Sequence, residues 1–288
     1  MRLALLLALA ALPLPGQPSV IGLYTQFLQP ASASVEASLH KEVTSIMASM
    51  GLEFAWRPLT GRRGNEVWRQ LAVIKLKGTC DGRLLSPNSF FEGALGWTHV
   101  VDGEILPFMD VDCDRIRAFI RRPLSNTTPE KRDEMLGRAV GRVVAHELYH
   151  ILGRTMHHGS GAASVPAYTV EALTGDEFLI EDTECRILEP AAEKGQVAAI
   201  ELRGSSRRGR TKFVEKHCDF CHGAEGEGTR RAPALRVPGH PLNAIELATR
   251  LGMEVRGMCR RAEQLKIVPP SLGQRDLADL VRFLNDGM

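Results

Sequence analysis

The chain has 288 residues, which suits two modest domains better than one large core. Hydrophobic residues make up 44% and charged residues 24%, the balance of an ordinary globular protein. A net charge of +2 indicates no concentrated basic surface, so the composition argues against a nucleic-acid partner.

Residues 3–14 form an almost unbroken apolar run behind the positive start Met1-Arg2. Such a run is too short to cross a bilayer but has the length of the central part of a secretory signal peptide. We therefore predict a signal peptide over residues 1–16, cleaved near Gly16, and a mature protein that is periplasmic or secreted. A short uncleaved anchor or a buried helix is the alternative. No later segment reaches the length of a transmembrane span.

The first elements after this segment are a helix and several strands. An amphipathic helix is predicted over residues 34–50, and Gly51 ends its pattern. The apolar positions at helical spacing are Leu39, Val43, Ile46 and Met47. Strands are predicted over residues 52–56 and 71–76, followed by a hairpin of strands 96–101 and 105–111 around Asp102-Gly103.

A long helix is predicted next. Thr127 or Thr128 can cap it, Pro129 suits its first turn, and Gly153 suits its C-terminal end. A helix, mixed strands and a long helix indicate an α+β domain, which we assign to residues 17–188.

This long helix carries the sequence H-E-x-x-H, with histidines at His146 and His150. Residues four apart share one helix face, so both imidazoles can bind one metal ion. Glu147 is placed to take a proton from a metal-bound water molecule, which makes it the candidate catalytic residue. The alternative is a buried helix in which His and Glu side chains satisfy each other.

With Gly153 the pattern reads H-E-x-x-H-x-x-G and resembles the zincin metallopeptidases. The resemblance implies a zincin-like fold, a bound Zn²⁺ ion and a peptide substrate. The third metzincin histidine would fall at Met156, which cannot take that role. A loose similarity to zincin domains fused to cytochromes favours His158 as third ligand, with His157 and Glu171 as alternatives. His157 or Tyr168 can stabilise the oxyanion in such a site.

The boundary between two domains is predicted after this part. Residues 189–203 have a helical pattern, and residues 204–210 are small, polar and basic. We assign a linker to residues 189–206 and a second domain to residues 207–288.

The second domain contains the sequence C-x-x-C-H, formed by Cys218, Cys221 and His222. Two thiols at this spacing reach the two vinyl groups on one haem edge, and the adjacent histidine then lies beneath the iron. A redox C-x-x-C pair normally lies in a βαβ context, and a zinc ribbon needs a second C-x-x-C; the sequence has neither. It therefore predicts one covalently attached haem c.

The surrounding residues resemble a small class I cytochrome c. Gly209 and Phe213 match the packing positions of that family's first helix, and the segment from Ala232 to Leu235 matches the stretch whose proline carbonyl orients the histidine ligand, here His222. A glycine-rich turn follows the motif at Gly223, Gly226 and Gly228. A last helix that crosses the first one is expected to use Leu277, Leu280, Val281, Phe283 and Leu284.

The distal iron ligand of this family is usually a methionine on the loop before the last helix. Met258 lies at the expected place, whereas Met253 and His240 are the alternatives. Core packing is the other role open to any one of these methionines.

Four further cysteines, Cys80, Cys113, Cys185 and Cys259, allow three disulfide pairings. Cys80 with Cys113 is favoured because both lie in the first domain.

Two functions follow from these motifs. The first is an exported monohaem cytochrome c that transfers single electrons to or from a redox partner protein, with a zinc-binding domain attached. The alternative is a zinc-dependent peptidase whose cytochrome domain serves targeting or redox regulation.

Overall fold

The computed structural model describes residues 19–48, 51–61, 68, 70–84, 93–101, 103–161, 164, 167–178, 181–193, 204–267, 272 and 274–286. The expected signal peptide over residues 1–16 lies outside these ranges. Among the described residues, no helix has both the length and the apolar character needed to cross a membrane.

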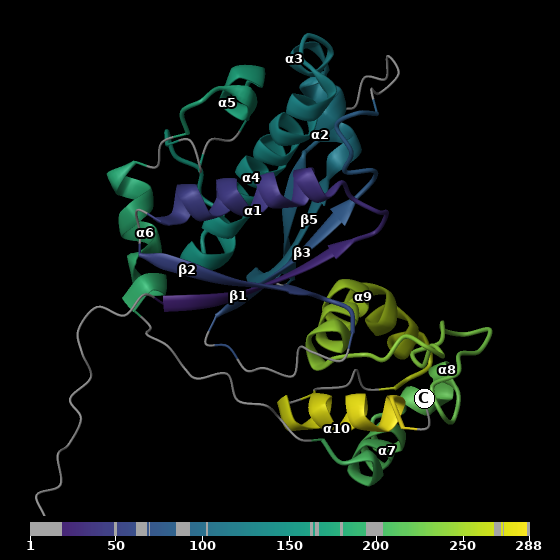
Figure 1. Ribbon diagram of the computed structural model, residues 1–288. Helices are drawn as coiled ribbons and strands as arrows, with labels where there is room; N and C mark the ends of the chain where they lie inside the picture. Colours follow the sequence, from purple (N-terminus) through teal and green to yellow (C-terminus); the bar gives the residue numbers. More distant parts are fainter. Residues whose placement is uncertain are drawn as a thin grey trace, which may run out of the picture.

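A five-stranded sheet in the order β2-β1-β3-β5-β4 forms the centre of the first domain (Figure 1). Its strands are β1 (Ser19–Phe27), β2 (Leu52–Pro58), β3 (Leu71–Lys77), β4 (Gly96–Val101) and β5 (Glu104–Asp112). All neighbouring strands are parallel except β4, which forms the expected antiparallel hairpin with β5. Strand β1, which lies between β2 and β3, was not predicted from the sequence. We predicted an α+β domain; helices and strands are both present, and the sheet is mixed and largely parallel.

Helices α1 (Ala33–Met47) and α4 (Pro129–Gly153) cover one face of the sheet. Ser32 begins α1 by accepting a hydrogen bond from the backbone of Ser34, and α1 ends at Met47, three residues before the predicted end. The four predicted apolar residues of α1 are all buried against this face of the sheet. Thr128 is the N-cap of α4 and Pro129 its first residue, as the sequence indicated.

Gly153 is the last residue of α4, but the left-handed residue that ends the helix is Arg154, with φ of 48°. We predicted that Gly153 would end the helix. In the structure, Gly153 lies one position before the residue that turns the chain. The remaining helices of the domain are α2 (Cys113–Phe119), α3 (Arg121–Ser125), α5 (Val170–Thr174) and α6 (Asp182–Glu193).

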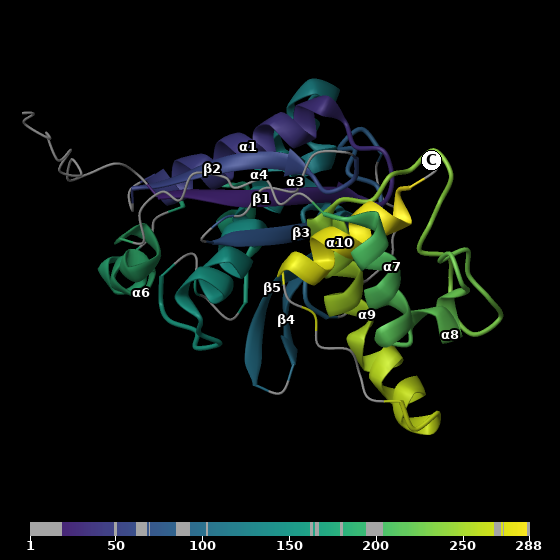
Figure 2. The same cartoon turned by 90° about the horizontal axis from the view of Figure 1, so that it is seen from below.

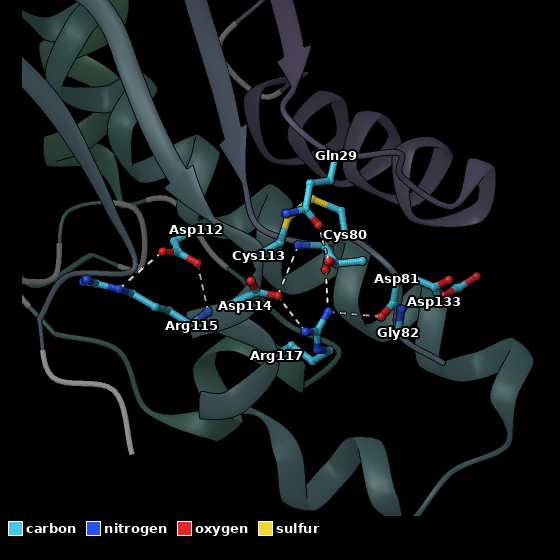
Figure 3. The surroundings of a disulfide bond; sticks show 11 residues. Gln29, Cys80, Asp81, Gly82, Asp112, Cys113, Asp114, Arg115, Arg117 and Asp133 are labelled. Carbon is cyan, nitrogen blue, oxygen red and sulfur yellow. Dashed lines mark hydrogen bonds and ion pairs between the residues drawn. A yellow bond between two sulfur atoms is a disulfide. The ribbon is translucent and has the colours of Figure 1, made fainter. Parts of the chain in front are cut away.

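A disulfide joins Cys80 to Cys113, as favoured from the sequence. The two cysteines follow the ends of the neighbouring parallel strands β3 and β5 (Figure 3). Arg117 reinforces the same junction by donating to the backbone oxygen of Thr79 at 2.5 Å and to Asp114 at 2.6 Å. This end of the sheet is therefore tied to α2 by covalent and polar contacts, which fixes β5 beside α4.

The second domain consists of α7 (Ser206–Glu215), α8 (Cys218–His222), α9 (Ala244–Gln264) and α10 (Gln274–Leu284). Figure 2 shows α7, α9 and α10 gathered next to one another. A Cβ atom at Gly209 would lie 2.0 Å from the backbone oxygen of Asp279, so only glycine allows α7 and α10 to cross so closely. Phe213 packs on Phe283 with a ring separation of 5.4 Å, as expected for two crossing helices.

Two predictions near the domain boundary need correction. The helix expected over residues 189–203 is α6, which begins at Asp182 and ends in the described chain at Glu193, and residues 194–203 lie outside the described ranges. The segment 204–210, expected to be a boundary loop, belongs mostly to α7. Ser205 caps this helix by accepting a hydrogen bond from the backbone of Arg208, which overrides the loop-like composition.

The second domain packs on the face of the sheet opposite α1 and α4 (Figure 1). Ile245 of α9 contacts a small buried cluster that contains Tyr24, Val73 and Phe108. The buried side chain of Asn243 donates to the backbone oxygens of Leu59 and Gly61, the latter at 3.3 Å. Both faces of the sheet are thereby covered, one by helices of its own domain and the other by α9.

Candidate metal centre and haem site

The C-terminal part of α4 brings together the two histidines of the H-E-x-x-H sequence. His146 and His150 are 8% and 2% exposed, because this part of α4 packs against the sheet. Their Nε2 atoms lie 3.0 Å apart, so both point toward one position. His158 approaches from the chain after the helix, and one nitrogen of each histidine lies within 4.8 Å of the others.

The geometry of His150 suits a metal ligand. Its Nδ1 donates a hydrogen bond of 2.7 Å to the backbone oxygen of Thr155, and a carbonyl can only accept. The proton is therefore on Nδ1, which leaves the lone pair of Nε2 free for a metal ion. The same contact holds the chain after α4 against His150, immediately before His158.

The cluster contains His158 and neither of the alternatives weighed from the sequence. Within the described part of the chain, His157 and Glu171 do not join the group of potential ligand atoms. His158 is exposed whereas the other two histidines are buried, so the cluster opens to solvent on the side of His158. Three imidazoles around one position, with an open side, form a group that could hold a metal ion, and Zn²⁺ accepts such ligands.

Glu147 lies beside this cluster against strand β4. Its Oε2 accepts a hydrogen bond of 2.7 Å from the hydroxyl of Thr98. Burial raises the pKa of Glu147 to about 7, although the hydrogen bonds from Thr98 act in the opposite direction. A carboxyl with this pKa can exchange a proton near neutral pH, as a general base or acid must.

Tyr168 also borders the cluster. Its ring lies 5.7 Å from the ring of His146, and its hydroxyl donates to the backbone oxygen of Arg142 at 3.3 Å. Burial, followed by the negative charges of Glu147 and Glu184, raises the pKa of Tyr168 well above its ordinary value. The phenol therefore stays protonated and can donate a hydrogen bond near the cluster.

The haem-binding sequence folds into the single turn of α8. Neither Cys218 nor Cys221 takes part in a disulfide, and both side chains are half-buried. Burial raises the pKa of the Cys218 thiol to about 11. A catalytic C-x-x-C pair needs a thiol with a lowered pKa, so the redox-pair alternative finds no support here.

His222 is oriented as the cytochrome resemblance implied. Its Nδ1 donates a hydrogen bond of 2.8 Å to the backbone oxygen of Pro233, which leaves Nε2 free to bind iron. The chain returns to Pro233 through Gly223, Gly226 and Gly228, which all have positive φ angles. The two thiols, the oriented imidazole and this returning loop fit a covalently attached haem.

The position of Met258 differs from the expectation. It lies within α9 and not on a loop before the last helix, because α9 continues to Gln264. Met258 follows Leu247 and Leu251 by 11 and 7 residues, which places all three on one face of the helix. Leu247 and Leu251 pack in the core of the second domain, whereas Met258, further along the helix, is not among the described residues that pack against this core. Met253 is also in α9, with its side chain outside the described residues, and His240 is exposed.

Thr98 and Thr155 are site residues that the sequence analysis did not single out. Both act through contacts that exist only in the folded chain. Thr98 donates to Glu147, 49 residues further along the sequence, and the backbone oxygen of Thr155 accepts from His150. A threonine in a strand next to the H-E-x-x-H helix has no sequence signal of its own.

No curated protein and no solved structure matches this chain. Residues 206–287 match the family model of Cytochrome c. The matched range runs from the start of α7 to just beyond α10 and includes the C-x-x-C-H sequence. The C-terminal part of the chain is therefore a cytochrome c domain, a family that carries covalent haem and transfers electrons.

Proposed function

We propose that this protein is an exported monohaem cytochrome c that transfers single electrons and carries a zinc ion in its first domain. The orientation of His222 by Pro233 carries the haem part of the proposal, together with the family match. The convergence of His146, His150 and His158 carries the zinc part.

Export is supported by two features. The chain begins with a short apolar run behind a positive charge, as secretory signals do. The Cys80–Cys113 disulfide suits an oxidising compartment such as the periplasm.

In the second domain, Cys218 and Cys221 would hold the haem, and His222 and Met258 would bind its iron. When bound, the haem supplies a one-electron couple. The protein contributes the fixed tautomer of His222 and the apolar core around Leu247 and Leu251, which limits access of water.

The second candidate function is that of a zinc peptidase, and the placement of Glu147 favours it. When bound, zinc would act as a Lewis acid toward a peptide carbonyl and a water molecule. Glu147, held by Thr98 and with a pKa of about 7, accepts the proton of the water molecule and passes it to the leaving amine. Tyr168 keeps its proton and would donate it to the developing oxyanion by turning away from the backbone oxygen of Arg142.

The test of the main proposal is the iron and zinc content of the full chain, produced in a strain that matures c-type cytochromes. We expect one iron that stays attached after denaturation and one zinc per chain. Iron that is lost on denaturation contradicts the covalent haem. Protein without zinc after growth in zinc-containing medium contradicts the zinc site.

The peptidase candidate is tested with Glu147→Gln. We expect this variant to lose hydrolysis of an unstructured protein substrate such as casein by at least about 100-fold. Its zinc content and haem spectrum should equal those of the wild type, because Glu147 is not among the zinc ligands. Wild-type protein that holds zinc and cuts no peptide contradicts the peptidase candidate.

A further inference from the structure

Two acidic residues contact the loop that carries His158: Glu181, just before α6, and Glu184, in the first turn of α6. The hydroxyl of Ser160 donates to Glu181 Oε2 at 3.0 Å. A Cβ atom at Gly161 would lie only 2.2 Å from Glu184 Oε2, so the chain passes directly over the Glu184 carboxylate. The loop that follows His158 is therefore in contact with both carboxylates.

Glu184 is buried to an unusual degree for a carboxylate. Its side chain is 1% exposed, and its Oε2 accepts a hydrogen bond of 2.8 Å from the backbone of Glu181. Its Oε1 is buried without a hydrogen-bond partner, and no cation of the described residues forms an ion pair with it. Burial of such a group costs stability, so its presence calls for a role outside folding.

The position of this carboxylate relative to the histidine cluster follows from the two segments that α6 contacts. Glu184 faces the backbone of Gly161, three residues after His158. One turn further along α6, Ile187 lies against the end of α4, where a Cβ atom at Gly153 would be 2.6 Å from its side chain. Helix α6 therefore contacts both the end of the helix that carries His150 and the loop that carries His158.

The loop that carries His158 is fixed at both of its ends. At its start, the backbone nitrogen of Thr155 donates to the backbone oxygen of His150 at 3.2 Å. At its end, Gly159 and Ser164 are joined by a backbone hydrogen bond of 3.0 Å, and Ser164 is 1% exposed. Between these points the described residues Ser160 and Gly161 contact α6 and the residue before it, through Glu184 and Glu181. Ile187 and Leu188 of α6 in turn pack against the core next to α4.

We propose that Glu184 is a positioning residue that holds the loop of residues 158–161 and thereby places His158 as the third metal ligand. This inference rests on the proposed zinc site. Glu184 acts through His158 and does not itself bind the metal. Its effect should therefore disappear when His158 is absent.

The experiment is a double-mutant cycle on the full haem-containing chain, with the dissociation constant for Zn²⁺ measured by competition with a chromophoric chelator. We expect Glu184→Ala to weaken Zn²⁺ binding about 10- to 100-fold, the range found when groups that orient metal ligands are removed. In the His158→Ala background, Glu184→Ala should have no further effect. Glu177→Ala, which removes an exposed acid of the same region, is the matched control and should bind Zn²⁺ like the wild type.

A second readout counts the ligands directly. Zinc X-ray absorption spectroscopy should find three imidazoles in the wild type and two in Glu184→Ala. Glu184→Gln keeps the size of the side chain and an oxygen for the backbone of Glu181, so it should bind Zn²⁺ nearly like the wild type. Gly161→Ala, which pushes the loop off Glu184, should weaken binding as Glu184→Ala does, and it serves if the alanine variant at Glu184 fails to fold.

The outcomes are separable. Unchanged Zn²⁺ affinity in Glu184→Ala or, where that variant does not fold, in Gly161→Ala overturns the positioning role and leaves the zinc site standing. An equal loss of affinity with and without His158 overturns it as well. A wild-type chain that binds no Zn²⁺ overturns the zinc site itself.

Discussion

At the scale of single residues, hydrogen bonds to the backbone decide which atoms of the two sites are free to bind a metal. His150 and His222 each donate through Nδ1 to a carbonyl, Thr155 in one case and Pro233 in the other. Each contact fixes the tautomer and turns Nε2 away from the chain. The same arrangement therefore prepares one imidazole for the metal centre of the first domain and another for the haem iron of the second.

Two adjacent histidines provide a test at this scale. His158→Ala should weaken Zn²⁺ binding by at least about 100-fold, because it removes one of three imidazole ligands. His157→Ala should leave the affinity near that of the wild type, since His157 lies outside the cluster. The measurement is zinc per chain after dialysis against a chelator of known affinity. A larger loss in the His157 variant would reverse the assignment of the third ligand.

At the scale of elements, the crossing of α7 and α10 holds the cytochrome domain together around its haem-binding turn. The Asp279 carboxylate of α10 is buried and accepts two hydrogen bonds of 2.8 Å from Arg208 of α7. The backbone of Ser205, the N-cap of α7, donates to the same carboxylate at 2.6 Å. One side chain thus fixes both the start of α7 and its angle to α10.

This contact predicts a pH dependence. The hydrogen bonds from Arg208 hold the pKa of Asp279 below its ordinary value of 3.8. A carboxyl whose pKa is lower in the folded chain adds stability above its ordinary pKa and loses it as the pH falls through the folded value. Asp279→Asn should therefore cost roughly 1 to 2 kcal/mol near pH 7, with a smaller difference from the wild type below about pH 4.

Denaturant unfolding, followed by the haem absorbance at several pH values, measures this difference in the domain concerned. Asp286→Asn is the matched control, because Asp286 is an exposed carboxylate just beyond the same helix. A difference between Asp279→Asn and the wild type that stays constant from pH 7 to pH 3 would contradict the role assigned to the charge.

At the scale of the whole molecule, α9 belongs to the cytochrome core and to the sheet of the first domain at once. One of its faces carries Leu247 and Leu251 into the second domain, and Ile245 on another face packs on the sheet. A Cβ atom at Gly252 would lie 2.3 Å from the ring of Phe108, which shows how closely the helix approaches β5. The haem domain is therefore held against the first domain by packing as well as by the chain that connects them.

Asn243 allows a test of this contact. Ser at this position keeps a side-chain oxygen that can cap α9 but is too short to reach the carbonyls of Leu59 and Gly61. Because all three tryptophans, Trp56, Trp68 and Trp97, lie in the first domain, the haem quenches their fluorescence most when the domains are in contact. We expect Asn243→Ser to raise tryptophan fluorescence with an unchanged haem spectrum. Asn285→Ser, which alters a contact within the second domain, is the control, and equal fluorescence in all three proteins would contradict the interface.

The sequence by itself determined the features whose chemistry depends on neighbouring residues. The C-x-x-C-H spacing, the i, i+4 histidines of α4 and the apolar periodicity of α1 all act within a few residues, so they can be read locally. The strands β2 to β5 and the long helix were located to within a few residues for the same reason, whereas β1 was missed. The favoured Cys80–Cys113 pair is also present in the structure, although spacing alone could not choose it.

Tertiary structure decided what depends on contacts between distant segments. The place of β1 between β2 and β3 is fixed by pairing with strands 33 and more residues away along the chain. Thr98 meets Glu147 because β4 lies beside α4, and Ile245 of α9 meets sheet residues that are far from it along the chain. The choice of His158 over His157 depends on the path of one loop between α4 and α6, because a shift of one residue in a loop changes which side chain faces the cluster.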